Sequence, residues 1–87
     1  FLQKIYSMEI EVLLFGITTD IVGQKSILLE ISDRITVADF KQKIIKHYPK
    51  LSTHNSFSVA VNMEYATDEV VINNGDVIAL IPPVSGG

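Results

Sequence analysis

The end of the sequence, Pro82-Pro83-Val84-Ser85-Gly86-Gly87, is the stretch best suited to chemistry. Two successive prolines favour an extended arm that projects away from the preceding residues. Glycine has no Cβ, so the last two residues can enter a narrow groove. The reactive group that such an arm delivers is the α-carboxylate of Gly87, which becomes an acyl donor once it is adenylated. A sulfide or an amine could then displace the adenylate, whereas composition alone also allows a passive, flexible end.

Other catalytic arrangements are absent from the sequence. There is no cysteine, and the two histidines, His47 and His54, have no third ligand at a workable spacing, so we expect no metal site. The serines lie in no nucleophile elbow, and no glycine-rich loop opens a helix. We therefore expect a protein that is not an enzyme by itself and that carries no sulfur on its own thiols.

Length and charge restrict the class of protein further. At 87 residues with 47% hydrophobic content the chain forms one globular domain. No apolar run is long enough for a membrane helix, and we interpret residues 1–7 as a leader or upstream extension in a cytoplasmic protein. All seven basic residues lie in the first 50 positions, which is not the pattern of a nucleic-acid binder. The acidic residues after position 50 form either a solvated face or a surface that steers basic partners toward the arm: Glu64, Asp68, Glu69 and Asp76.

Hydrophobic periodicity predicts a mainly β-structure with one helix. In the first strand, Ile10, Val12 and Leu14 share one face, and Leu13 and Phe15 lie on the other. The expected elements are strands over 8–16, 25–32, 57–62, 64–66 and 77–81, a loop with a possible helical turn over 17–24, and a helix over 37–48.

Helix and strand ends are also marked in the sequence. Thr36 is the expected N-cap, paired with Asp39 three residues later, and Pro49 ends the helix. The last strand is apolar throughout, which favours the middle of a sheet, and Pro82 should stop its pairing. This order of elements predicts an α+β grasp, a sheet with one helix laid across it.

Several segments resemble one family in the same order along the chain. They are "IEVLLFG" (10–16), "DIVGQ" (20–24), "TVADF" (36–40), "YPKL" (48–51), "VAVNMEYA" (59–66) and, most specifically, "NNGDVIALIPPVSGG" (73–87). Together they resemble the sulfur-carrier (small) subunit of molybdopterin synthase, the MoaD family, over about residues 8–87. Because Pro82-Pro83-Val84 leads into the Ser-Gly-Gly end at the positions where that family has them, the resemblance favours a functional arm over a passive end.

The resemblance implies a ubiquitin-like β-grasp domain over 8–82 and a flexible arm over 83–87. An adenylating enzyme of the ubiquitin-activating type would use ATP and magnesium to activate Gly87, and a sulfur donor would convert it to a thiocarboxylate. The arm residues Pro83 to Gly86 would insert into the large catalytic subunit, where sulfur passes to cyclic pyranopterin monophosphate. Phe15, with Leu13, would contact the partner, and no cofactor, nucleic acid or membrane would be bound.

Three other functions remain compatible with this sequence. A sulfur carrier of the thiamine pathway shares the fold and the Gly-Gly end, although "IPPV" (81–84) argues against it. A protein modifier would join Gly87 to lysines of its targets. A plain ubiquitin-like binding module would tolerate the loss of Gly87.

Overall fold

The computed structural model describes residues 8–31, 34–54 and 57–82. The expected leader over 1–7 and the expected arm over 83–87 lie outside these residues.

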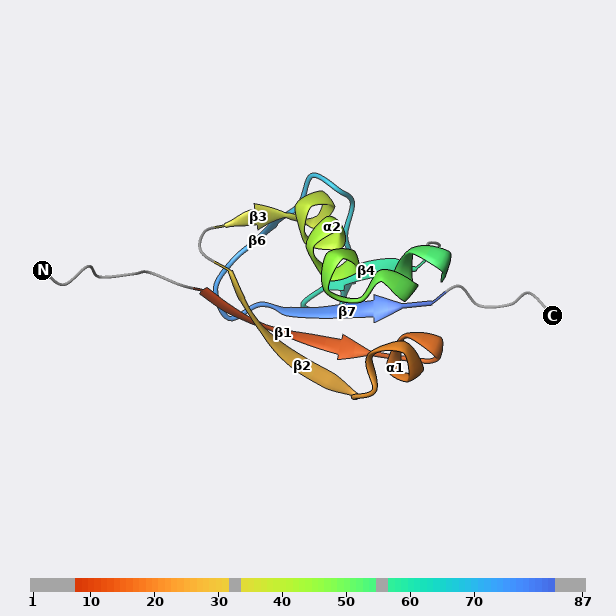
Figure 1. Ribbon diagram of the computed structural model, residues 1–87. Helices are drawn as coiled ribbons and strands as arrows, with labels where there is room; N and C mark the ends of the chain where they lie inside the picture. The colour runs from red at the N-terminus through yellow and green to blue at the C-terminus, as the bar shows by residue number, and fades with distance from the viewer. Residues whose placement is uncertain (1–7, 32–33, 55–56, 83–87) are drawn as a thin grey trace, which may run out of the picture.

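A five-stranded mixed sheet forms the body of the protein (Figure 1). Its strand order is β2-β1-β7-β4-β5, with β7 at the centre, as the uninterrupted apolar sequence of that strand predicted. β7 runs parallel to β1 and antiparallel to β4. The bounds are β1 (Met8–Leu14), β2 (Ser26–Ile31), β4 (Ser58–Val61), β5 (Glu64–Tyr65) and β7 (Val77–Ile81).

One main helix, α2 (Val37–His47), lies across one face of this sheet (Figure 1). It buries the predicted stripe of Val37, Phe40 and Ile44, while Tyr48 just after it is half-buried. The sheet supplies the opposite side of the core, including Ile10, Val12, Leu14, Val59, Ile78 and Leu80. The predicted α+β grasp is confirmed.

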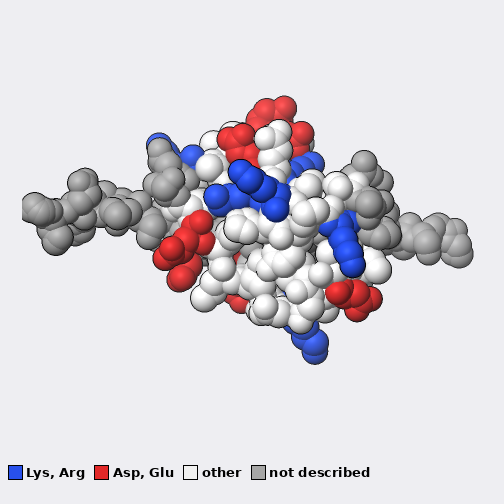
Figure 2. Space-filling view, viewed as in Figure 1, with Lys and Arg blue, Asp and Glu red and all other residues white. Residues whose placement is uncertain are grey.

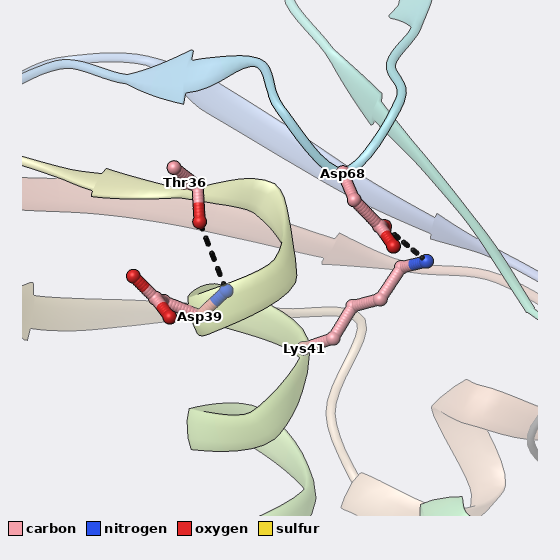
Figure 3. Close-up of polar contacts among 4 residues, drawn as sticks. All are labelled: Thr36, Asp39, Lys41 and Asp68. Atoms are coloured by element: carbon pink, nitrogen blue, oxygen red, sulfur yellow. Dashed lines mark hydrogen bonds and ion pairs between the residues drawn. The ribbon is translucent and has the colours of Figure 1, made fainter.

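The predicted N-cap of α2 is present. The backbone N–H of Asp39 donates to Thr36 Oγ1 at 3.2 Å (Figure 3), which satisfies one of the free donors in the first turn of the helix. The cap fixes where the helix begins, directly after the strand β3 (Ile35–Thr36).

Four short elements were not predicted as such. They are α1 (Ile17–Val22), β3, the 3-10 helix η1 (Pro49–His54) and β6 (Val71–Ile72). Among the described strands, β3 and β6 pair only with each other. A strand of two residues is too short to show the alternation of apolar and polar residues that marks a strand in a sequence. α1 was expected only as a turn within a loop. In its first turn the buried Thr18 hydroxyl binds the preceding Phe15, accepting from the Phe15 N–H at 2.9 Å and donating to the Phe15 carbonyl at 2.6 Å.

Candidate functional site at the end of the central strand

The candidate site lies where β1 and β7 end side by side. Leu14 pairs with Leu80, so Phe15 and Gly16 continue β1 next to Ile81 and Pro82. A Cβ at Gly16 would stand 2.8 Å from Cγ of Pro82, and Gly16 has a φ of +57°, which favours glycine. The chain thus leaves β7 in close contact with the connection between β1 and α1.

Regular pairing of β7 stops at Ile81, as predicted for a strand followed by a proline without an N–H. Pro82 is half-buried and is the last described residue. The predicted site residues Pro83, Val84, Ser85, Gly86 and Gly87 lie outside the described residues, so their roles stay predictions. The structure does fix the point from which they depart.

The sheet face opposite α2 carries an apolar hollow beside this point. One row across four strands pairs Leu13 with Ala79, Ala79 with Ala60, and Ala60 with Tyr65. The two alanines leave a low centre between larger side chains, and the hollow measures about 260 Å³. We call it the apolar hollow; it is lined by Leu13, Phe15, Ala60, Met63, Tyr65, Val77, Ala79 and Ile81.

Large apolar side chains on this hollow remain exposed to water. Phe15 is 48% exposed, Tyr65 74% and Met63 96%. Exposed apolar side chains gathered around a concave surface are typical of sites that bind another protein. The structure therefore brings the predicted pair Phe15 and Leu13 together in one concave surface, and their contact with a partner stays a prediction.

Met63 and Tyr65 were missed in the sequence because their position depends on the turn between β4 and β5. Asn62 and Met63 both have positive φ, 52° and 73°, the backbone of a tight hairpin turn. Asn62 also ties the turn to β7, since its Oδ1 accepts from the Val77 N–H at 3.0 Å. Asn62 in the turn itself was the available signal, because asparagine tolerates positive φ.

The acidic residues do not surround the start of the arm, which corrects the steering hypothesis. Asp76 immediately precedes β7 and Pro82 immediately follows it, so roughly 20 Å of extended chain separates them. Asp68 lies at the N-terminal end of α2, where its carbonyl accepts from the Ala38 N–H at 3.2 Å. Its carboxylate pairs with Lys41 Nζ at 2.9 Å (Figure 3). The sequence order concealed this because a strand starts and ends at opposite edges of a domain.

Glu64 also lies away from the start of the arm. It pairs with Val61, which pairs with Ile78 in the first half of β7. These carboxylates therefore lie away from the start of the arm and are not placed to steer it.

The histidines and helices of the described part of the chain bear on metal ligation and membrane insertion. His47 is exposed at the end of α2, and the side chain of His54 lies outside the described residues. Among the described residues, no three His, Cys, Asp or Glu side chains are grouped closely enough to hold a metal ion. None of the helices described is long and apolar enough to cross a membrane.

Comparison with known proteins relates this geometry to a family. Residues 12–87 match the ThiS family. The molybdopterin synthase sulfur carrier subunit of Dictyostelium discoideum is 36% identical over 93% of this chain and 99% of its own length. The Arabidopsis thaliana protein of the same name is 34% identical over 93% of this chain and 85% of its own.

Solved structures share the fold. SAMP1 from Haloferax volcanii superposes with a TM-score of 0.78 at 26% identity, covering 91% of this chain and 99% of its own. A complex of subunits 1 and 2 of molybdopterin-converting factor from Helicobacter pylori contains a chain with a TM-score of 0.65 at 23% identity, covering 92% of this chain and 100% of its own. The chain therefore belongs to the ThiS family, in the group that includes the molybdopterin synthase sulfur carrier subunits.

Proposed function

We propose that this chain is the sulfur-carrier subunit of a molybdopterin synthase and that Gly87 carries the sulfur. The observation that supports this most is the apolar hollow, which lies beside the residue from which the arm departs. A carrier must dock its body on a partner while its terminus reaches that partner's active site. A binding surface next to the start of the arm meets both requirements.

The proposed chemistry begins with activation of the terminal carboxylate. A carboxylate oxygen of Gly87 attacks the α-phosphorus of ATP and releases pyrophosphate, which leaves an acyl-adenylate. A sulfide from the sulfur donor then attacks the carbonyl carbon and displaces AMP. The sulfur of the resulting thiocarboxylate, a softer and better nucleophile than the oxygen it replaces, attacks a carbon of cyclic pyranopterin monophosphate and displaces an oxygen group from it. Water then cleaves the acyl–sulfur bond, which leaves the sulfur on the pterin and regenerates the carboxylate of Gly87.

The length of the arm sets where the partner's active site must lie. Five residues follow Pro82, and fully extended they span at most roughly 17 Å. The partner's reacting atoms must therefore lie within that distance of Pro82 when the apolar hollow is covered. The small side chains at the tip of the arm allow it to pass through a narrow channel.

The partners follow from this chemistry. The large catalytic subunit would cover the apolar hollow, in keeping with the Helicobacter pylori complex of two subunits, one chain of which shares this fold. The adenylating enzyme would bring ATP and magnesium, so this chain needs no stably bound cofactor. These reactions belong to the cytoplasm, where we place the protein.

A second function, modification of other proteins, has its own support. SAMP1 is a small archaeal modifier protein by name, and its body superposes on this one over nearly the whole chain. Both functions begin with the same adenylate, and they differ in whether sulfide or a lysine amine displaces AMP. The body of the protein is compatible with either nucleophile.

Exchange of pyrophosphate into ATP tests the activation step. With the adenylating partner present, the full chain should support exchange, and a chain lacking Gly87 or extended beyond it should not. Circular dichroism of each variant checks that the fold is intact. Undiminished exchange with a folded chain that lacks Gly87 would refute the proposed role of the terminus.

A further inference from the structure

The edge strand β2 offers an open row of backbone hydrogen-bonding groups. The Leu14 N–H donates to the Lys25 carbonyl at 2.9 Å, which makes Leu14 and Lys25 a hydrogen-bonded pair of the antiparallel ladder. Such pairs alternate, so the N–H and C=O groups of Ser26, Leu28 and Glu30 point away from β1. No described strand pairs with β2 on that side.

A groove runs between this edge and the end of α2. It measures about 390 Å³ and is lined by Gln24, Ile27, Leu28, Leu29, His47 and Tyr48; we call it the β2–α2 groove. Leu28 is 67% exposed, while Ile27 and Leu29 are half-buried. The rings of His47 and Tyr48 form the opposite wall, with centroids 6.4 Å apart. An open strand edge with apolar side chains beside it is the arrangement to which an extended peptide adds as a further strand.

The flanks of the β2–α2 groove carry positive charge. Lys43 precedes His47 by one helical turn and therefore shares its side of α2, and Lys46, three residues after Lys43, is the neighbour of Lys43 on the helix surface. Lys25 stands at the other end, just before β2. Figure 2, which views α2 above β2, shows basic side chains over α2 and one at the lower end of this face, with uncharged surface between them and acidic side chains at the left and lower right.

We propose that the β2–α2 groove binds an extended peptide segment of a partner protein, apolar in its centre and acidic at its flanks. The segment pairs with the outward groups of Ser26, Leu28 and Glu30 and places apolar side chains against Ile27, Leu29 and Tyr48. Its acidic flanks lie near Lys25 and Lys43. The carboxylates on the same two elements are Glu30 near the end of β2 and Asp39 one turn before Lys43 on α2. Glu9 and Glu11 pair with Glu30 and Leu28 from β1, and their side chains lie on the sheet face away from α2.

Charge also decides against a second copy of this chain as the occupant. Antiparallel pairing of two β2 edges about a two-fold axis would continue the sheet and bring the two α2 helices together on one side of it. The lysines Lys43 and Lys46 would then face their own copies, and facing like charges oppose association.

The groove is separate from the apolar hollow. The hollow lies on the sheet face away from α2, across β1, β7, β4 and β5, and the groove lies at the β2 edge on the α2 side. The chain can therefore hold the peptide segment while a partner covers the hollow. The proposal goes beyond the sulfur-carrier function and does not depend on it.

A synthetic peptide with a core of alternating valine and isoleucine between runs of glutamate tests the proposal. Titration into the isotopically labelled full chain should shift the backbone amide signals of Ser26, Leu28 and Glu30 in a saturable manner. The same peptide with N-methylated core residues cannot donate to the strand and should not bind, and a lysine-flanked version should bind more weakly. Shifts centred on the apolar hollow or on β5, equal binding by the N-methylated peptide, or no binding would each overturn the proposal.

Matched lysine variants test whether the positive charge beside the β2–α2 groove contributes to peptide binding. Replacing Lys43 and Lys46 with glutamine should raise the Kd of the glutamate-flanked peptide roughly fivefold, in line with exposed ion pairs. Lys41→Gln, on the other flank of α2 beside Asp68, should leave the Kd unchanged. Equal effects of the two sets would overturn the assignment of the groove, and so would self-association through β2 in sedimentation experiments.

Discussion

Replacing Phe15 with alanine should weaken binding of the large catalytic subunit by an amount that the structure allows us to work out. Phe15 is 48% exposed in the free chain. A phenylalanine presents about 200 Å² in total, so about 100 Å² is left for a partner to cover. At about 25 cal/mol per Å² this area is worth about 2.5 kcal/mol, and slightly less once the alanine Cβ is subtracted. A loss of about 2 kcal/mol corresponds to roughly a 30-fold rise in Kd.

Isothermal titration calorimetry of the two subunits measures this change. Thermal melts of each variant identify a temperature at which the variant and the parent are both folded, since Phe15→Ala also removes the buried part of the ring. Val71→Ala is the matched control: Val71 is 46% exposed but lies on β6, outside the apolar hollow, so its Kd should not change. An unchanged Kd for Phe15→Ala, or an equal loss for Val71→Ala, would refute the assignment of the hollow as the binding surface.

Three further predictions concern the body that carries the arm. Thr36→Ala should lower the free energy of unfolding by about 1 kcal/mol in urea denaturation, because α2 loses its cap, and Thr36→Ser should restore most of it. Ile78→Ala, at the fully buried centre of β7, should cost about 2 to 5 kcal/mol, and a loss below 1 kcal/mol would contradict the described packing. Asp68→Asn breaks the Lys41 pair, whose side chains are 34% and 57% exposed, so it should cost less than about 1 kcal/mol, and the effect should vanish in high salt.

The main elements of the fold were predictable because each has a local signal of sufficient length. The alternation of Ile10, Val12 and Leu14 marks a strand with one buried face, and all three side chains are buried. Thr36 and Pro49 mark the limits of the helix, and the observed α2 lies between them. In each case the residues that mark the element in the sequence are also those that form its packing or its cap in the structure.

The candidate site was only partly predictable, because it is assembled from segments far apart in the sequence. Phe15 and Leu13 were identified, but the hollow beside them exists because Ala79 and Ala60 align across neighbouring strands. That alignment depends on the pairing register, which the pattern of one strand does not contain. The position of Asp76 was misjudged for a related reason, since nearness to the arm in sequence is not nearness in space.

Central to this account is the claim that the carboxylate of Gly87 becomes a thiocarboxylate. The most direct test is the intact mass of the chain after incubation with its adenylating enzyme, ATP, magnesium and sulfide, with fragmentation to locate any change. We predict a mass increase equal to the replacement of one oxygen by sulfur, located at Gly87 and dependent on ATP. An unchanged mass despite ATP consumption, or appearance of Gly87 only in isopeptide links to lysines of other proteins, would contradict the account.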